Sequence, residues 1–352
     1  MHMKERDKLI DVLKGVGIVS VVVGHAGALH PALQNVPSIG FVYLYHLMVF
    51  FFVGGMLHRP GKYANAYEYM AHQFKSLLPL YLGYNFAYLL LHNVFVKLNM
   101  LNAELYTLDN FIITGCSVPI FAHTEAFAGA MWFVIVLLVA KAIFAAAFDL
   151  AGKVRYGWVV HAIVILGTAF VGLYTNSRDM YLLFHIQTAF LAVPVMYLGF
   201  LFGRYREKIQ GFFHPIVCVV SAAGLLWVLA NVGDIELSVN RIISPALFYP
   251  VTALGMVFCI SLARIIQRIK PCQKLFAYAG KISFHIMGLH FLIFKCFDRI
   301  YGAIVGADPQ TMGAYPTAYQ NMGLVYSLLG VGVSIIVVFT VRKLAAFAKK
   351  ST

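Results

Sequence analysis

Long apolar stretches recur along the whole chain, separated by short segments that are polar or rich in glycine and proline. Each stretch has about 18 to 25 residues, the length that a helix needs to cross a hydrocarbon core about 30 Å thick. The pattern predicts about ten membrane-spanning helices. They are expected at residues 9–29, 37–57, 74–98, 127–148, 157–175, 181–203, 212–232, 244–264, 276–296 and 322–343. The predicted fold class is therefore all-α, a polytopic membrane protein.

The composition agrees with this prediction. Of the 352 residues, 61% are hydrophobic and 12% are charged, and the mean hydropathy of +0.79 is far above that of a soluble domain. No soluble domain, low-complexity tract or internal repeat interrupts the pattern, so residues 1–352 are expected to form one integral-membrane domain. The first stretch includes Asp11 and Lys14 and is longer than the apolar part of a signal peptide, so it is expected to remain as the first helix.

The positive charge of the chain is unevenly distributed. The net charge of +13 alone would be compatible with nucleic acid, but the basic residues gather between alternate apolar stretches. Such clusters are typical of cytoplasmic loops. If the chain begins inside the cell, 21 basic residues lie in cytoplasmic segments and five lie in outer segments. Both termini are therefore predicted to be cytoplasmic, and no nucleic-acid partner is expected.

Neither a disulfide framework nor a metal site is indicated. The five cysteines are odd in number and lie mostly inside or beside apolar stretches, unlike the paired cysteines of small secreted domains. The histidines and acidic residues show no compact spacing of the kind that metal ligands adopt, so no metal is expected.

The first predicted helix carries three polar residues on one face. On a helix, the eleven residues from Lys14 to His25 return the side chain to within about 20° of its starting direction and advance about 16 to 17 Å. Asp11 lies one turn before Lys14 on nearly the same stripe. Charged groups in a bilayer usually face a helix-bundle interior or a watered cavity. The structural alternative is that Lys14 extends to the membrane interface and that His25 only bonds to a neighbouring helix.

These residues also carry a resemblance. The stretch RDKLIDVLKGVGIVSVVVGH, residues 6–25, resembles the first helix of the integral-membrane acyltransferase family 3, whose hallmark is a basic residue, ten intervening residues and a histidine. In this sequence the two hallmark positions are Lys14 and His25. The sequence of this stretch is most similar to that of the fucose-4-O-acetylase-like branch of the family.

Later segments resemble the same family in the same order. They are LYHLMVFFFVGGML (44–57), KSLLPLY (75–81), MWFVIVLLVAKAIF (131–144) and YAGKISFHIMGLHFLIF (278–294), which match family positions at His46, Gly55, Lys75, Trp132, Ser283 and His290. Four departures stand out. Gly54 replaces the usual serine, the usual proline after Trp132 is absent, and Phe284 and His285 replace leucine and tyrosine.

The resemblance implies an enzyme that transfers an acetyl group from acetyl-CoA to a hydroxyl of a cell-envelope or exported carbohydrate or glycolipid, in a bacterial inner membrane. Histidine suits a base near neutral pH, and His25 is the predicted general base. The expected site consists of catalytic residues His25, Lys14, Asp11, His46 and His290, cofactor-binding residues Lys14, Arg59, Lys62 and Lys75, and pocket residues Trp132 and Ser283. The connections at 99–126 and 297–321, both predicted to be outer, are expected to select the acceptor.

Alternatives remain for single residues and for the whole protein. Arg59, Lys62 and Lys75 also fit the cytoplasmic charge bias, His46 fits a packing role among aromatic rings, and Trp132 fits an interfacial anchor. His161 and His185 match no family position and are interpreted as structural. A secondary transporter or proton-coupled carrier also places charges and histidines within its helices. Direct transfer and transfer through an acetylated His25 both stay open.

Overall fold

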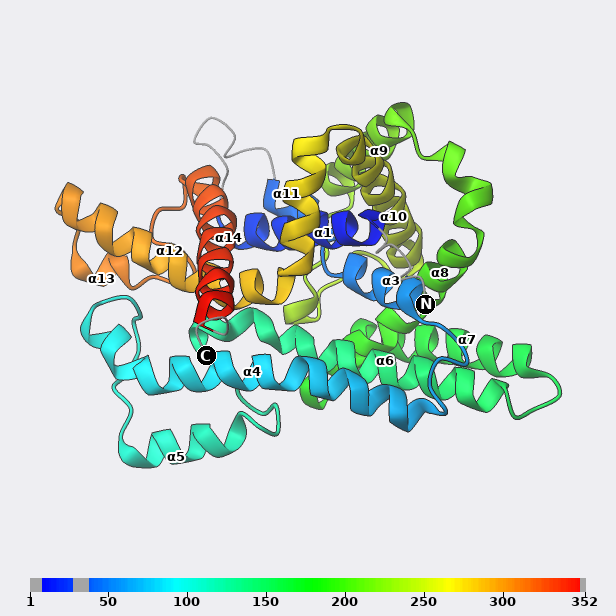
Figure 1. Ribbon diagram of the computed structural model, residues 1–352, viewed down its shortest axis with the longest axis horizontal. Helices are drawn as coiled ribbons and strands as arrows, with labels where there is room; N and C mark the ends of the chain where they lie inside the picture. The colour runs from blue at the N-terminus through cyan, green and yellow to red at the C-terminus, as the bar shows by residue number, and fades with distance from the viewer. Residues whose placement is uncertain (1–7, 28–37, 349–352) are drawn as a thin grey trace.

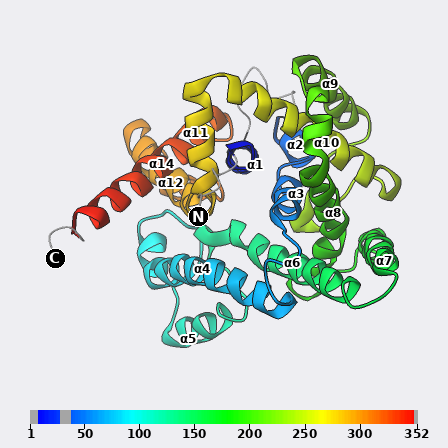
Figure 2. The ribbon, with the colours of Figure 1, turned by 45° about the vertical axis from the view of Figure 1, so that its right-hand side comes forward.

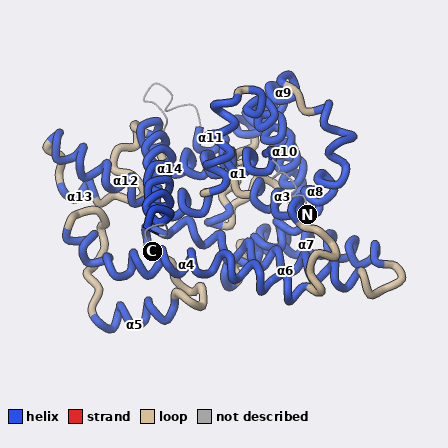
Figure 3. The backbone as a smooth tube through the Cα atoms, viewed as in Figure 1, coloured by secondary structure: helices blue, strands red, loops and turns tan. Residues whose placement is uncertain are grey.

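The computed structural model describes residues 8–27 and 38–348, and this part of the chain folds into helices joined by turns and loops, without strands (Figures 1 and 3). The basic residues Lys4, Arg6, Lys349 and Lys350, which entered the charge count, lie outside the described residues. The α-helices are α1 (Lys8–His25), α2 (Ser38–Tyr43), α3 (Met48–Leu57), α4 (Ala66–Lys97), α5 (Leu108–Ser117), α6 (Trp132–Ala151), α7 (Gly157–Ser177), α8 (Ile186–Ile209), α9 (Pro215–Asn231), α10 (Pro245–Arg268), α11 (Lys270–Lys281), α12 (Ser283–Val305), α13 (Pro309–Met312) and α14 (Gly323–Ala348). Short 3₁₀ helices are η2 (Ala126–Met131), η3 (Leu183–His185), η4 (Gln210–Phe212) and η5 (Leu237–Val239).

Helices occur at all ten segments in which spans were predicted. Within the described residues, six helices are long and apolar enough to cross a membrane, and a bent pair raises the number to seven. The all-helical, multi-pass membrane fold is thereby confirmed. The number of ten spans and the cytoplasmic position of the two termini stay predictions.

The single straight helix predicted at 276–296 is wrong. The segment is divided between α11 and α12, which meet at Ile282 with a bend of 87°. Taken together, the two helices are apolar enough to continue the hydrophobic pattern, and a pattern along the chain contains no information about a change of axis. The outer connections were likewise predicted as loops, whereas 99–126 includes α5 and α12 extends through Val305.

Helix α1 lies inside the protein, and Figure 2 looks almost along its axis. It contacts α2, α3, α10, α11, α12 and α14. Two glycines allow α11 to cross it closely, because a Cβ atom at Gly15 would lie 2.1 Å from the Phe276 carbonyl oxygen and one at Gly280 would lie 1.8 Å from that of Asp11. This backbone contact fixes the bent pair against the polar face of α1.

A second close crossing joins α3 to α8. A Cβ atom at Gly55 would lie 1.9 Å from the carbonyl oxygen of Met196, and one at Gly199 would lie 1.9 Å from that of Phe52. Side chains larger than hydrogen would force these helices apart. The crossing places α3 and the preceding turn, which carries His46, between α1 and α8.

Candidate active site

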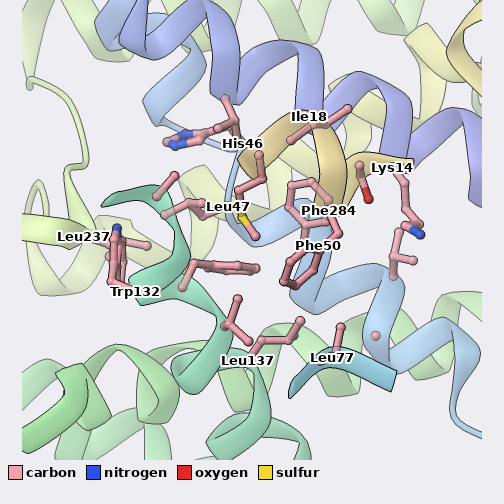
Figure 4. A pocket seen from close by; sticks show the side chains of 18 of the residues that line it. Lys14, Ile18, His46, Leu47, Phe50, Leu77, Trp132, Leu137, Leu237 and Phe284 are labelled. Atoms are coloured by element: carbon pink, nitrogen blue, oxygen red, sulfur yellow. The ribbon is translucent and has the colours of Figure 1, made fainter. Parts of the chain in front are cut away.

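Half of the ten predicted site residues line one internal cavity. It has a volume of about 370 Å³ and lies between α1, the α2–α3 segment, α4, α6 and the α11–α12 bend. Figure 4 shows Lys14 at one end of the cavity and Trp132 with Leu237 at the opposite end. We name these the inner end and the outer end, following the predicted topology. Predicted site residues on the cavity wall are Lys14, His25, His46, Trp132 and Ser283.

Lys14 and His25 face the same cavity, as the helical spacing predicted. Ile18 and Val21, on the stripe between them, also line it. Asp11 is buried, but it faces a second cavity and its carboxylate lies 4.0 Å from the Lys281 ammonium. This ion pair joins α1 to the end of α11.

His25 and His290 form a hydrogen-bonded pair. The His25 Nδ1 atom lies 3.1 Å from His290 Nε2, and the two rings stack with centroids 5.2 Å apart. His290 Nδ1 lies 3.1 Å from the carbonyl oxygen of Ile286. A carbonyl only accepts, so the neutral His290 ring carries its proton on Nδ1 and presents a lone pair at Nε2. His25 then donates from Nδ1, which leaves the lone pair of its Nε2 available to act as a base.

His46 provides a second imidazole on the same cavity. Its Nδ1 atom donates to the carbonyl oxygen of Val42 at 3.0 Å, and its ring stacks on that of Tyr43 at 4.9 Å. The side chain is 7% exposed, so its position is fixed by packing as well as by the hydrogen bond. The same bonding logic gives the neutral ring a lone pair at Nε2.

A second, basic cavity of about 800 Å³ adjoins the inner end. Lys14 and Leu57 line both cavities, and the predicted Arg59 lines the second one together with Arg204 and Arg206. His58 also faces it, and among the described residues its ring nitrogens have no partner. Burial lowers the pKa of His58 to about 4, so the ring is neutral near pH 7. The second cavity thus combines guanidinium groups with a neutral donor and acceptor.

The other predicted cofactor residues lie elsewhere. Lys62 is exposed and donates to the Tyr63 hydroxyl at 3.1 Å, and Lys75 is exposed on α4. In the described part of the chain, neither belongs to the wall of the two cavities. Their role toward a cofactor stays a prediction.

Several cavity residues were not anticipated from the sequence. Lys141, Lys281, Glu236, Leu237 and Ser238 line the first cavity. The lysines entered the sequence analysis only as cytoplasmic charges, and the 236–238 segment follows α9 without any resemblance to a motif. His185, interpreted as structural, has its ring 5.1 Å from that of Trp132 at the outer end.

A cluster of two histidines and a buried glutamate links α4 to the segment that leads into the helix carrying Trp132. The outer clamp, as we name His92, His123 and Glu125, brings Nδ1 of His92 to 3.3 Å and Nε2 of His123 to 3.5 Å from the Glu125 carboxylate. The Glu125 backbone N–H donates to Asn85 at 3.0 Å. Because Glu125 directly precedes η2, which leads into α6, the clamp fixes where Trp132 enters the cavity wall.

The apolar helices and the internal cavity with imidazole and ammonium groups are those of an integral-membrane protein with a polar internal site. Residues 7–343 match the family model described as acyltransferase domain, which covers nearly the whole chain. The protein belongs to acyltransferase family 3, as the sequence resemblance predicted, and is a membrane acyltransferase. Comparison with curated proteins and with solved structures gives no match. Its place in the fucose-4-O-acetylase-like branch stays a prediction.

Proposed function

We propose that the protein is an O-acetyltransferase that moves an acetyl group from cytosolic acetyl-CoA to a hydroxyl of a cell-envelope or exported carbohydrate, with His25 as general base. The observation that carries the proposal is the pair of adjoining cavities, which share Lys14 and lead from Arg59 to His25. The chain provides an imidazole on the first cavity and, adjoining it, a basic cavity for an anionic donor.

The arrangement fits an elongated donor. The nucleotide of acetyl-CoA would occupy the basic cavity, where Arg59, Arg204 and Arg206 match phosphate charge. The pantetheine arm would pass Lys14 and Leu57 into the first cavity. Helix geometry places His25 about 16 to 17 Å beyond Lys14, a separation comparable to an extended arm. The thioester would then lie beside the two imidazoles.

The proposed reaction needs one proton transfer in each direction. His25 Nε2 takes the proton of the acceptor hydroxyl as its oxygen attacks the thioester carbonyl carbon. The C–S bond then breaks, the thiolate of CoA leaves, and the imidazolium returns the proton to the sulfur. His290 accepts from His25 Nδ1 throughout, which keeps the ring in one orientation and stabilises its charged form. Transfer through an acetylated His25 would use the same ring atom.

The outer end fits an acceptor that is rich in hydroxyl groups. Trp132 offers an aromatic face, and Ser238 and Glu236 offer polar atoms at the same end. Glu236 also accepts from Ser238 at 3.2 Å and pairs with Arg241 at 3.0 Å. Pockets of this kind combine an apolar surface with a few placed polar groups that orient the ligand. The acceptor would therefore reach His25 from the side opposite to the donor.

The proposal is tested with purified protein and radiolabelled acetyl-CoA. We expect CoA to raise the apparent unfolding temperature, because a ligand that binds only the folded state stabilises it. We also expect the purified protein to transfer base-labile label from acetyl-CoA to an envelope polysaccharide fraction that was prepared from cells lacking the gene. Stabilisation by a sugar without any stabilisation by CoA, together with sugar uptake into proteoliposomes, would instead establish the carrier alternative.

A further inference from the structure

The inner end of the first cavity carries an excess of positive charge. Three lysines line the cavity, namely Lys14, Lys141 and Lys281. The acidic residue on the wall, Glu236, belongs to the outer end and pairs with Arg241. Asp11 lies behind the wall, 4.0 Å from Lys281. At least one ammonium group therefore faces the cavity beyond what these carboxylates balance.

Lys141 is the most unusual of the three lysines. It projects from the stripe of α6 that also brings Val134 and Leu137 to the cavity. Its ammonium group donates to the Gln73 side-chain oxygen on α4 at 2.7 Å. Among the described residues it makes no ion pair, and Lys14 is close enough to repel it. A cation in such surroundings is costly unless an anion accompanies it.

The local structure keeps this charge available. Gln73 is neutral, so it orients the ammonium group without cancelling its charge. Gly54 lies beside the lysine stem, since a Cβ atom there would be in van der Waals contact with Lys141 Cε at 3.7 Å. Lys141 thus faces Lys14 across the cavity with its position fixed and its charge uncompensated by Gln73.

We propose that Lys141, oriented by Gln73, binds the diphosphate of the acetyl donor together with Lys14 from the opposite wall. This inference rests on the proposed function. Two ammonium groups on facing walls match a ligand group that carries two negative charges. Lys141 lies nine residues after Trp132, about 13 to 14 Å inward along α6. The bound diphosphate is therefore at the end of the cavity remote from the acceptor and from His25. This is the end at which the pantetheine arm of the donor would begin.

The test compares CoA with pantetheine, which lacks the phosphates, by titration calorimetry on the purified full chain. For Lys141→Met we expect the affinity for CoA to fall at least about tenfold, as for a lost charge-assisted contact, while the affinity for pantetheine stays within about twofold. Lys141→Arg should retain most of the CoA affinity. The matched control is Lys153→Met, which removes an exposed lysine beyond the end of α6 that pairs with Asp149.

Gln73→Glu tests the charge of Lys141 without removing the Lys141 side chain. It keeps Lys141 but places a carboxylate about where the amide oxygen now accepts, so it should compete with the diphosphate and lower CoA affinity without lowering the unfolding temperature. Should Lys141→Met fail to fold, this variant decides the question. The assignment of Lys141 would be overturned if the wild type bound CoA and the Gln73→Glu protein, and any folded Lys141→Met protein, bound it with the same affinity. Absence of CoA binding by the wild type would overturn the donor proposed above.

Discussion

Two groups of buried histidines in this protein are built in opposite ways. In the pair of His25 and His290, each ring donates to one acceptor. His25 donates to His290, and His290 donates to the Ile286 carbonyl oxygen. In the outer clamp, His92 faces acceptors with both nitrogens, the Glu125 carboxylate at 3.3 Å and the Glu104 carbonyl at 3.1 Å. Only a ring with protons on both nitrogens donates to both acceptors.

The difference separates a ring that can act as a base from a ring whose two nitrogens both face hydrogen-bond partners. The neutral His25 ring retains a lone pair and lines a cavity, so it can take a proton from a ligand. The His92 ring has no free nitrogen, and it is covered by the ring of Tyr106 with centroids 3.4 Å apart. Burial and residue type are therefore insufficient to identify a catalytic histidine, because the available lone pair and the adjacent space decide the role.

The largest effect is expected for His25→Ala. Loss of a general base lowers kcat by about 10² to 10⁴-fold, and removal of a ring that lines a cavity should leave the protein folded and inserted. Initial rates of acetyl transfer, normalised to folded protein, measure the effect. His161→Ala is the matched control. His161 does not line the cavity, and its Nδ1 atom lies 2.8 Å from the Tyr197 hydroxyl. Near-normal turnover by His25→Ala would remove the proposed base.

His290 should act through His25, and its substitutions are graded accordingly. His290→Ala leaves the His25 ring without its acceptor, and loss of orientation of a catalytic group costs up to about 10²-fold in kcat. His290→Gln can place an amide oxygen near the same position and should recover part of the rate. The Michaelis constant for acetyl-CoA should change little. Equal rates for the alanine and glutamine variants would indicate that His290 only fills space.

The sequence was sufficient for features that lie on one helix. Lys14 and His25 share a face because helical periodicity fixes their directions, whatever packs around them. Lys141, the 87° bend at Ile282 and the segment 236–238 depend on contacts between helices that are distant along the chain. Gln73 and Lys141 are 68 positions apart, and neither carries a pattern that marks it. His290 was found through resemblance, but its bond to His25 required coordinates.

Lys14→Ala should affect the donor more than the acceptor. Lys14 lines both cavities on the path to His25, and loss of a charge-assisted contact raises the Michaelis constant for acetyl-CoA by about tenfold. The constant for the acceptor should stay within about twofold, because Trp132 and Ser238 lie at the other end. Kinetics with each substrate varied in turn measure both constants. An effect confined to the acceptor would contradict the placement of the nucleotide.

The smallest effect on catalysis is expected in the outer clamp. His92→Ala leaves the Glu125 carboxylate buried with one partner fewer, and breaking a buried pair costs about 3 kcal/mol or more. The apparent unfolding temperature should fall by several degrees, whereas kcat per folded molecule should stay within about twofold of the wild type. Glu125→Gln should be milder, since the amide still accepts a hydrogen bond without leaving an unpaired charge. If His92→Ala instead lost turnover at an unchanged unfolding temperature, the two histidine groups would not differ in the way that their bonding indicates, and a neutral ring with a free lone pair would no longer distinguish the catalytic one.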